Sequence, residues 1–325
     1  MPGTVLLTDR AWPDDEVERG VITAAGFDLV AGPGEPAPAE LIEDLVREHR
    51  PAAILTCWAP VTRAAIEASP ALRVVARMGV GLDNIDVEAA TERGVLVTNV
   101  PDYCVPEVSD HALALVLAWT RGIVAADRAV RAGRWDPAAA RLRRLGALTC
   151  GIVGYGRIGR ETARKLGAFG CTLVATDPLP PADPGPVRFT DLDTLLALSD
   201  VVIVHAPLTP ETQGLIGAPQ LARMRPGGLL VNVSRGGLVV TSAVQAALAG
   251  GHLGGAALDV LDSEPHVPPE LLTQEGAVLT PHIAFSSDRS LLDLRRGAAE
   301  EVVRVLRDEP ARHPRNAPAG PGVPA

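Results

Sequence analysis

Arg235, Glu264 and His282 are the side chains of this chain best suited to acid–base and anion chemistry. Each comes a few residues after an apolar stretch that is typical of a buried strand. In open α/β sheets, ligands bind at the carboxyl ends of the strands. We therefore expect these three side chains to face the same crevice.

Their chemical types suggest a division of roles. A histidine, with an ordinary pKa near ~6.5, can give a proton to a carbonyl oxygen and take it back from an alcohol. Glu264 would hold the second nitrogen of the His282 ring and stabilise its protonated form. Arg235 would bind a carboxylate with its planar fork and polarise a neighbouring carbonyl. Taken singly, each of the three is also compatible with an ordinary loop residue that only contacts solvent.

A glycine-rich turn indicates where a cofactor would bind. Gly154, Gly156 and Gly159 form G-x-G-x-x-G between a predicted strand ending at 152–153 and a predicted helix at 160–169. The first glycine permits the tight turn, the second lets a pyrophosphate approach the backbone, and the third lets helix and strand pack closely. The N–H groups at the start of the helix would receive the phosphate charge.

An acidic residue selects between the two dinucleotides. Asp177 ends the next predicted strand, near the ~20-residue distance at which a carboxylate binds the ribose 2′-hydroxyl. The following residues, 178–181, include no Arg or Lys to neutralise a 2′-phosphate. The sequence therefore predicts NAD as the cofactor in preference to NADP.

Short apolar runs alternate with helical stretches along the chain, which is typical of α/β proteins with parallel sheets. The pattern runs to about residue 98 and restarts at 152, and 325 residues exceed the usual size of one domain. Residues 105–120 predict a long apolar helix between the two halves. We therefore expect two doubly wound domains, followed by a proline-rich, disordered tail at 313–325.

Composition narrows the class of partner. The net charge of −9 argues against nucleic acid or an anionic membrane as the main partner. The four cysteines have no metal-ligand spacing, and no apolar stretch is long enough to span a bilayer. The N-terminus lacks the pattern of a signal peptide. We expect a cytoplasmic protein without a metal.

Five longer segments resemble the D-2-hydroxyacid dehydrogenase family over nearly the whole chain. They are 78–86 (MGVGLDNID), 205–212 (HAPLTPET), 230–237 (LVNVSRGG), 257–265 (ALDVLDSEP) and 280–284 (TPHIA). The resemblance implies an NAD-dependent oxidoreductase that transfers a hydride between nicotinamide and C2 of a small D-2-hydroxy or 2-oxo acid. Arg235, Glu264 and His282 would be its catalytic residues, with His282 as the acid/base.

The resemblance also implies domain boundaries and further contacts. A Rossmann cofactor domain would span 100–283, a discontinuous flavodoxin-like substrate domain 1–99 and 284–312, and the protein would be a homodimer formed through its cofactor domains. Besides Arg235, the substrate would contact Cys57, Val80, Gly81 and Phe285. The residues expected to contact NAD are Gly154, Gly156, Arg157, Ile158, Gly159, Asp177, His205, Pro207, Thr212, Val233, Ser234 and Asp259.

Two alternatives to this function remain at the level of sequence. Residues 99–103 and 108–115 resemble the branch with bacterial relatives of the C-terminal-binding-protein corepressors, which favours an NADH-sensing interaction protein. Arg235 could also bind a phosphite- or phosphonate-type anion. A phosphoglycerate substrate is not expected, because Thr56-Cys57 stands where phosphoglycerate dehydrogenases typically have Arg-Ser. The natural substrate and the favoured direction are left open.

Overall fold

The chain folds into two compact units, which are described separately. The computed structural model describes residues 3–139 and 142–318. Unit 1 contains the described residues up to Tyr103 and from Ser287 onward, and unit 2 contains those from Cys104 to Ser286. The chain thus leaves unit 1 and returns to it, and both crossings lie a few residues after the boundaries expected at 99/100 and 283/284.

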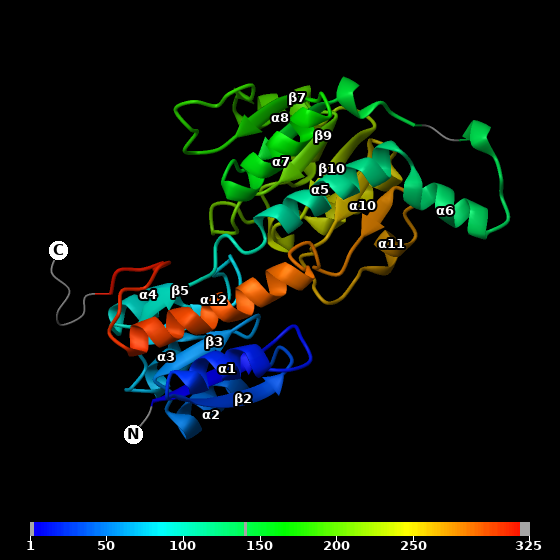
Figure 1. Ribbon diagram of the computed structural model, residues 1–325. Coiled ribbons are helices and arrows are strands. Elements are labelled where there is room, and N and C mark those ends of the chain that lie inside the picture. The colour runs from blue at the N-terminus through cyan, green and yellow to red at the C-terminus, as the bar shows by residue number, and fades with distance from the viewer. Residues whose placement is uncertain (1–2, 140–141, 319–325) are drawn as a thin grey trace. The chain divides into compact units, whose positions relative to one another are not determined.

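Unit 1 is a five-stranded parallel sheet in the order β2-β1-β3-β4-β5 with helices on both faces (Figure 1). Successive side chains of a strand point to opposite faces. Val5 and Leu7 accordingly join a core with residues of α12, whereas Leu6 joins a second core with residues of α2, α3 and α4. The elements are β1 (Thr4–Asp9), α1 (Glu16–Ala24), β2 (Asp28–Gly34), α2 (Ala39–His49), β3 (Ala53–Thr56), α3 (Arg63–Ala68), β4 (Val74–Arg77), α4 (Val87–Glu92), β5 (Leu96–Thr98) and α12 (Asp288–Leu306).

Two elements of unit 1 are absent from the apolar pattern of the sequence. β2 is an edge strand whose sequence, DLVAGPG, contains two glycines and a proline and leaves several side chains exposed. α1 buries only Glu18 and Ile22. Neither element carries enough apolar residues to be recognised without its packing partners.

The expectation of a disordered tail from 313 is wrong for residues 313–318, and 319–325 lie outside the described residues. Pro314 forms an antiparallel bridge with Thr98, and the Arg315 N–H donates to the Val97 carbonyl at 2.8 Å. The prolines in this stretch prevent helix formation, but they do not prevent an extended segment from pairing with the β5 edge.

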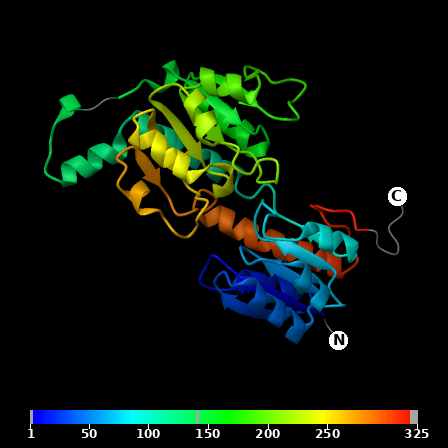
Figure 2. The same cartoon turned by 180° about the vertical axis from the view of Figure 1, so that it is seen from behind.

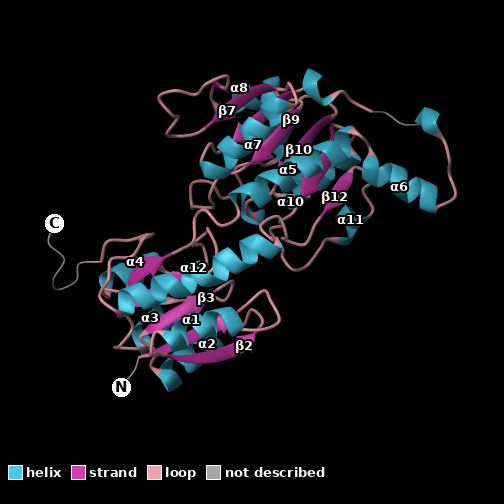
Figure 3. Ribbon diagram, in the orientation of Figure 1, coloured by secondary structure: helices cyan, strands magenta, loops and turns pink. Residues whose placement is uncertain are grey.

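Unit 2 is a seven-stranded parallel sheet in the order β12-β11-β10-β9-β6-β7-β8, drawn as magenta arrows in Figure 3. Together with unit 1 it confirms the predicted fold class of two parallel-sheet α/β domains. Its strands are β6 (Thr149–Val153), β7 (Thr172–Thr176), β8 (Arg188–Phe189), β9 (Val201–Val204), β10 (Gly228–Asn232), β11 (Leu253–Leu258) and β12 (Ala277–Leu279). Its helices are α5 (Val105–Thr120), α6 (Ile123–Arg131), α7 (Arg157–Ala168), α8 (Leu192–Leu198), α9 (Ala218–Arg223), α10 (Thr241–Ala249) and α11 (Pro269–Leu272).

The strand order of unit 2 reverses beside β6. β7 and β8 extend the sheet on one side of β6, and β9 to β12 extend it on the other. The reversal lies between β6 and β9, and the carboxyl ends of the strands at such a reversal are the usual place for a ligand in an open α/β sheet. The glycine-rich turn lies after β6, at this point.

The apolar helix α5 packs within unit 2, against α7, β10 and β11. Its burial against these elements accounts for its apolar composition. Across the described residues, none of the helices has both the length and the apolar character that crossing a bilayer requires.

Candidate active site

The three glycines of the turn after β6 have three different surroundings. A Cβ at Gly154, which has φ +93°, would lie 2.6 Å from the Ala206 nitrogen, and a Cβ at Gly159 would lie 2.2 Å from the Gly154 carbonyl oxygen. A Cβ at Gly156 would have no heavy atom within 4 Å. Gly154 and Gly159 are thus required by the packing of the protein itself, whereas the space beside Gly156 can accept a ligand.

Asp177 braces this turn. Its Oδ2 accepts the Tyr155 N–H at 2.6 Å, and its Oδ1 accepts the Leu179 N–H at 2.8 Å. Each carboxylate oxygen has a second lone pair, which leaves acceptor capacity for a ribose hydroxyl. Asp177 forms no ion pair with a basic side chain of the described chain. A negative, unneutralised carboxylate at this position fits a ribose with a free 2′-hydroxyl.

His205 is predicted to contact the cofactor, and its ring forms a hydrogen bond within the protein. Its ring Nε2 lies 2.9 Å from Thr162 Oγ1 on α7, and its backbone N–H donates to the Val153 carbonyl at 2.7 Å. Burial lowers the pKa of His205 to about 3, so the ring is neutral near pH 7. The imidazole therefore connects the end of β9 to α7.

The remaining predicted cofactor residues follow the carboxyl ends of β9 and β10 or begin α7. Thr212 Oγ1 donates to the Pro207 carbonyl at 2.8 Å and accepts the Thr209 N–H at 2.7 Å, which folds the loop after β9 on itself. Ser234 Oγ donates to the Val204 carbonyl at 2.8 Å and so joins the ends of β10 and β9. Arg157 and Ile158 begin α7, and Val233 directly follows β10.

Arg235 is placed by the glycine that follows it. A Cβ at Gly236 would lie 1.8 Å from the Leu261 carbonyl oxygen, so the backbone after β10 touches the backbone after β11. Asn232 Nδ2 donates to the Arg235 carbonyl at 2.9 Å and holds the same turn from the other side. Arg235 Nη1 donates to the Ser234 carbonyl at 2.9 Å. This close approach brings the guanidinium to the segment that carries Glu264.

Glu264 and His282 form the pair that their positions in the sequence predict. His282 Nδ1 lies 2.8 Å from Glu264 Oε2, and Glu264 Oε1 accepts the Leu261 N–H at 2.8 Å. Partial burial would raise the pKa of Glu264, but the hydrogen bond and charge of His282, the Leu261 N–H and the charge of Arg235 together lower it. Glu264 is therefore an anion that can orient the ring and stabilise its protonated form.

Asp259 holds the loop that presents His282. Its side chain is buried, and its two oxygens accept the N–H groups of Ile283 at 3.0 Å and Ala284 at 2.9 Å. The His282 N–H donates to the Asp259 carbonyl at 2.8 Å, and His282 has φ +54°, a backbone conformation that residues other than glycine rarely adopt. The carboxylate predicted to lie near the nicotinamide thus fixes the conformation of the histidine loop.

Two residues that support this loop were not predicted from the sequence. Thr280 Oγ1 donates to Asp259 Oδ1 at 2.5 Å, and His111 Nε2 on α5 lies 3.0 Å from Thr280 Oγ1. Both residues lie in segments that carry the family resemblance. Their contact joins positions 169 residues apart in the chain, a relation that local spacing does not reveal.

In unit 1, the residues predicted to bind the substrate carboxylate through their backbone amides, Val80 and Gly81, lie three and four residues after the end of β4. Val80 is 37% exposed. Among the described residues, neither the Val80 nor the Gly81 N–H has an acceptor. Two adjacent backbone N–H groups that point the same way can bind an anion. Unit 1 therefore offers the amides expected to bind a carboxylate.

The other predicted substrate residues differ in their exposure. The Cys57 side chain is 2% exposed and lies in the core of unit 1, and burial raises the pKa of its thiol to about 12. A ligand would therefore not meet the Cys57 thiol. Phe285, in unit 2, packs edge-on to the His282 ring with 6.1 Å between the ring centroids. Phe285 can therefore contact a ligand that binds beside the His282 ring.

Comparison with known proteins decides the family. Residues 113–284 match the model described as "D-isomer specific 2-hydroxyacid dehydrogenase, NAD binding domain", which covers more than half of the chain. The chain belongs to this family. The matched residues lie within unit 2, so unit 2 carries the family's NAD-binding domain.

The proteins to which this chain is similar are named for several different substrates. A D-3-phosphoglycerate dehydrogenase of Archaeoglobus fulgidus is 39% identical over 85% of this chain, but the chain spans only 54% of that relative. An NADPH-dependent glyoxylate/hydroxypyruvate reductase of Sinorhizobium meliloti, solved with NADP and malonate, is 31% identical with a TM-score of 0.86 and 97% of each chain covered. A D-lactate dehydrogenase of Aquifex aeolicus, solved with NAD and lactic acid, is 26% identical, with a TM-score of 0.83 and 94% and 96% coverage of this and that chain.

The residues of unit 2 fit a nicotinamide dinucleotide. The open space beside Gly156, at the N-terminus of α7, suits the pyrophosphate, and the Asp177 carboxylate suits the ribose. No group of three or more His, Cys, Asp or Glu side chains among residues 3–139 and 142–318 is arranged to hold a metal ion.

Proposed function

We propose that this protein is an oxidoreductase that uses NAD and transfers a hydride between the nicotinamide and C2 of a small D-2-hydroxy acid or 2-oxo acid. The observation that carries the proposal is the contact of His282 Nδ1 with Glu264 Oε2 at 2.8 Å, on a segment that also lies within the electrostatic reach of Arg235. This set supplies a proton donor, its orienting carboxylate and a fixed cation. Those are the groups that reduction of a carbonyl beside a carboxylate requires.

In the proposed reaction, each of the three residues has its own role. NADH, when bound, supplies the hydride that adds to C2 of the oxo acid. His282 gives a proton from Nε2 to the carbonyl oxygen, while Glu264 holds Nδ1 and stabilises the charged ring. Arg235 orients the substrate and polarises its carbonyl, since its guanidinium stays charged throughout. In the reverse direction His282 takes the proton back.

The substrate is proposed to be small and unphosphorylated. The amides of Val80 and Gly81 bind its carboxylate. Thr56, the last residue of β3, is buried and donates to the Ala59 carbonyl at 2.8 Å, and Cys57 follows it, so neither position offers a basic side chain to a phosphate. This distinguishes the chain from phosphoglycerate dehydrogenases, although a protein of that name is among its relatives.

NAD is proposed in preference to NADP. The family likeness does not decide this choice, because the similar Sinorhizobium protein is NADPH-dependent. The support comes from Asp177, whose carboxylate would repel a 2′-phosphate and can accept a bond from a 2′-hydroxyl.

A homodimer is proposed because one part of unit 2, the arm formed by α6 and the residues just after it, is exposed. Figures 1 and 2 show α6 standing away from the sheet of this unit, and none of its residues is buried. Ile123 and Val130 on α6 are exposed, and Trp135, just after it, is 85% exposed. A second copy of the cofactor domain would cover this apolar surface.

The alternatives gain no specific observation from the structure. The relatives cited above are named dehydrogenases or reductases, and none of these names refers to a phosphite, a phosphonate or a corepressor. The oxidoreductase proposal therefore stands alone.

The test is turnover of a panel of 2-oxo acids, including glyoxylate, hydroxypyruvate, pyruvate and branched-chain oxo acids, with NADH and with NADPH. We expect turnover with at least one oxo acid, and a kcat/KM at least ~100-fold higher with NADH. His282→Ala should reduce turnover by ~10²–10⁴ while NADH still binds in a fluorescence titration. Absence of turnover with every acid would overturn the proposed activity, and equal kcat/KM with NADPH would overturn the cofactor assignment.

A further inference from the structure

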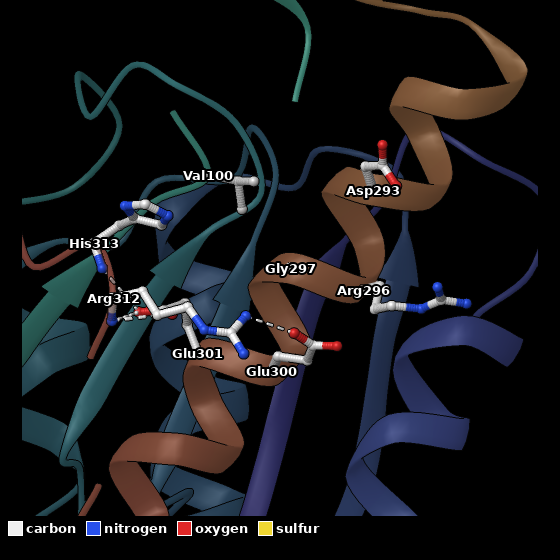
Figure 4. Close-up of a pocket in the computed structure, with 8 residues that line it drawn as sticks. All are labelled: Val100, Asp293, Arg296, Gly297, Glu300, Glu301, Arg312 and His313. Carbon is white, nitrogen blue, oxygen red and sulfur yellow. Dashed lines mark hydrogen bonds and ion pairs between the residues drawn. The ribbon is translucent and has the colours of Figure 1, made fainter. Parts of the chain in front are cut away.

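The C-terminal segment, residues 311–316, is held firmly against unit 1. Glu301 of α12 is buried, and its carboxylate accepts the N–H groups of Arg312 at 3.0 and 3.2 Å and of His313 at 3.3 Å. Figure 4 shows this contact beside a cavity of about 260 Å³ that is lined by residues of α12, the segment and Val100. A buried carboxylate satisfied by backbone amides fixes the path of the chain at this point.

Beyond Glu301 the segment pairs with the edge of the sheet. The Arg315 N–H donates to the Val97 carbonyl at 2.8 Å, and the Val97 N–H donates to Asn316 Oδ1 at 2.7 Å. Asn316 Nδ2 also donates to the Val95 carbonyl at 2.9 Å. Since β5 is the last strand of this sheet, the segment occupies an edge that would otherwise be open.

The Arg315 side chain then reaches a buried asparagine. Arg315 Nε donates to Asn99 Oδ1 at 2.6 Å, and Asn99 Nδ2 donates to the Val80 carbonyl at 2.6 Å. Asn99 is 3% exposed. Arginine has no acceptor, so the atom of the Asn99 amide that faces it must be the oxygen. Arg315 thereby fixes which way the amide points and directs Nδ2 toward Val80.

This bond orients the amides that the proposed function assigns to the substrate carboxylate. The Gly79 carbonyl accepts the Val100 N–H at 3.2 Å, and the Val80 carbonyl accepts Asn99 Nδ2. In a trans peptide the C=O and the following N–H point in opposite directions. Anchoring the Gly79 and Val80 carbonyls therefore directs the Val80 and Gly81 N–H groups together, away from residues 99–100.

We propose that Arg315 is a positioning residue for substrate binding, which acts through Asn99 on the Val80–Gly81 amides. This inference rests on the proposed function for its effect on substrate affinity, but not for its effect on the loop. It assigns the C-terminal segment a part in forming the carboxylate site of unit 1.

The test compares substitutions that keep or remove the donor at the Nε position. Arg315→Gln places an amide nitrogen the same number of bonds from Cα as Nε, whereas Arg315→Met has similar length and no donor. Arg312→Met is the matched control, because Arg312 belongs to the same segment but pairs with Glu300 at 2.8 Å. Asn99→Asp is a second variant, since it keeps the acceptor for Arg315 and loses the donor to Val80.

We expect Arg315→Met and Asn99→Asp to raise the KM of the oxo acid about tenfold, the effect of one hydrogen bond of ordinary strength. The kcat and the Kd of NADH should stay within about twofold, and Arg315→Gln and Arg312→Met should resemble the wild type. Amide hydrogen exchange of the peptide covering 78–82 should be faster in Arg315→Met than in Arg315→Gln.

Equal KM and equal exchange in Arg315→Met and Arg315→Gln would overturn the proposal. So would a rise in KM that Arg312→Met shares. If the wild type turns over no oxo acid, the proposed function fails, and the exchange comparison alone decides whether Arg315 positions the loop.

Discussion

At the scale of the residue, Arg235 is a cation on a backbone turn that is held from both sides. Its turn is held between the Asn232 amide and the Leu261 carbonyl, which Gly236 allows to approach. The guanidinium lowers the pKa of Glu264 together with His282. Because the turn is held in place, the planar guanidinium is held in place as well. The geometry of this cation therefore matters for binding a carboxylate, in addition to its charge.

For Arg235→Lys we therefore expect loss of function without loss of the fold. The ammonium keeps the charge but not the two-point contact, and kcat/KM for the oxo acid should fall by at least ~10²-fold, as for a lost charge-assisted contact of ~3 kcal/mol. Steady-state kinetics, thermal melting and NADH titration measure the three properties. A variant that melts early or loses NADH, while its folded fraction turns over normally, would make Arg235 a structural residue.

At the scale of elements, the glycines of the turn between β6 and α7 differ in the space around them. Gly159 lies against the Gly154 carbonyl, whereas Gly156 faces open space at a φ of −71° that alanine also adopts. A side chain at position 159 would therefore meet backbone, whereas a side chain at position 156 would occupy the space proposed for the cofactor.

The two alanine substitutions should therefore have opposite effects. We expect Gly156→Ala to leave the melting temperature unchanged and to weaken NADH binding at least ~10-fold, since the methyl group occupies the space proposed for the pyrophosphate. Gly159→Ala should lower the free energy of unfolding by ~1–3 kcal/mol through overpacking against backbone. Calorimetry with and without NADH separates the effects, and an unstable Gly156→Ala would contradict the assignment.

The contact between β9 and α7 predicts a pH dependence of stability. Burial lowers the pKa of His205 from its usual ~6.5 in the unfolded chain to about 3 in the folded one. Between these values the unfolded state binds the proton and the folded state does not. Stability from this residue is therefore complete above pH ~6.5 and falls with decreasing pH, with a slope of up to about 1.4 kcal/mol per pH unit.

His205→Gln should flatten this slope. The measurement is the free energy of unfolding in denaturant between pH ~4 and ~7, with His266→Gln as control because His266 is exposed. A slope that is unchanged in His205→Gln, or equally reduced in His266→Gln, would show that another group carries the dependence.

At the scale of the whole molecule, the exposed arm around α6 predicts the oligomeric state. We expect light scattering to give twice the mass of one chain, and the double variant Val130→Asp/Trp135→Ser to shift the protein toward the monomer, because it removes apolar area from the proposed interface. Leu179→Ser is the control, since Leu179 is as exposed as Trp135 but lies on another loop. A monomeric wild type would contradict the dimer.

Relations between residues that are close together in the sequence were sufficient to predict much of the fold. Glycine spacing, the apolar runs of the strands and the distance to Asp177 are relations within a few tens of residues, and they predicted the fold class and the tight turn between β6 and α7. His282 and Glu264, 18 residues apart, were paired on their chemical types and on their positions after β12 and β11. In a parallel sheet, residues that follow neighbouring strands meet at one edge, so sequence order implies their proximity.

Only the tertiary structure decided the supporting contacts. Arg315 and Asn99 are 216 residues apart, and His111 and Thr280 are 169 apart. Nothing in the local composition near Arg315 distinguishes a paired edge segment from a disordered tail, because the apolar and polar partners that order it lie on β5 and α12. The thiol of Cys57 is another case, since its burial follows from packing around β3 and not from its own sequence position. Such contacts depend on which distant surfaces the fold brings together, and that information exists only in three dimensions.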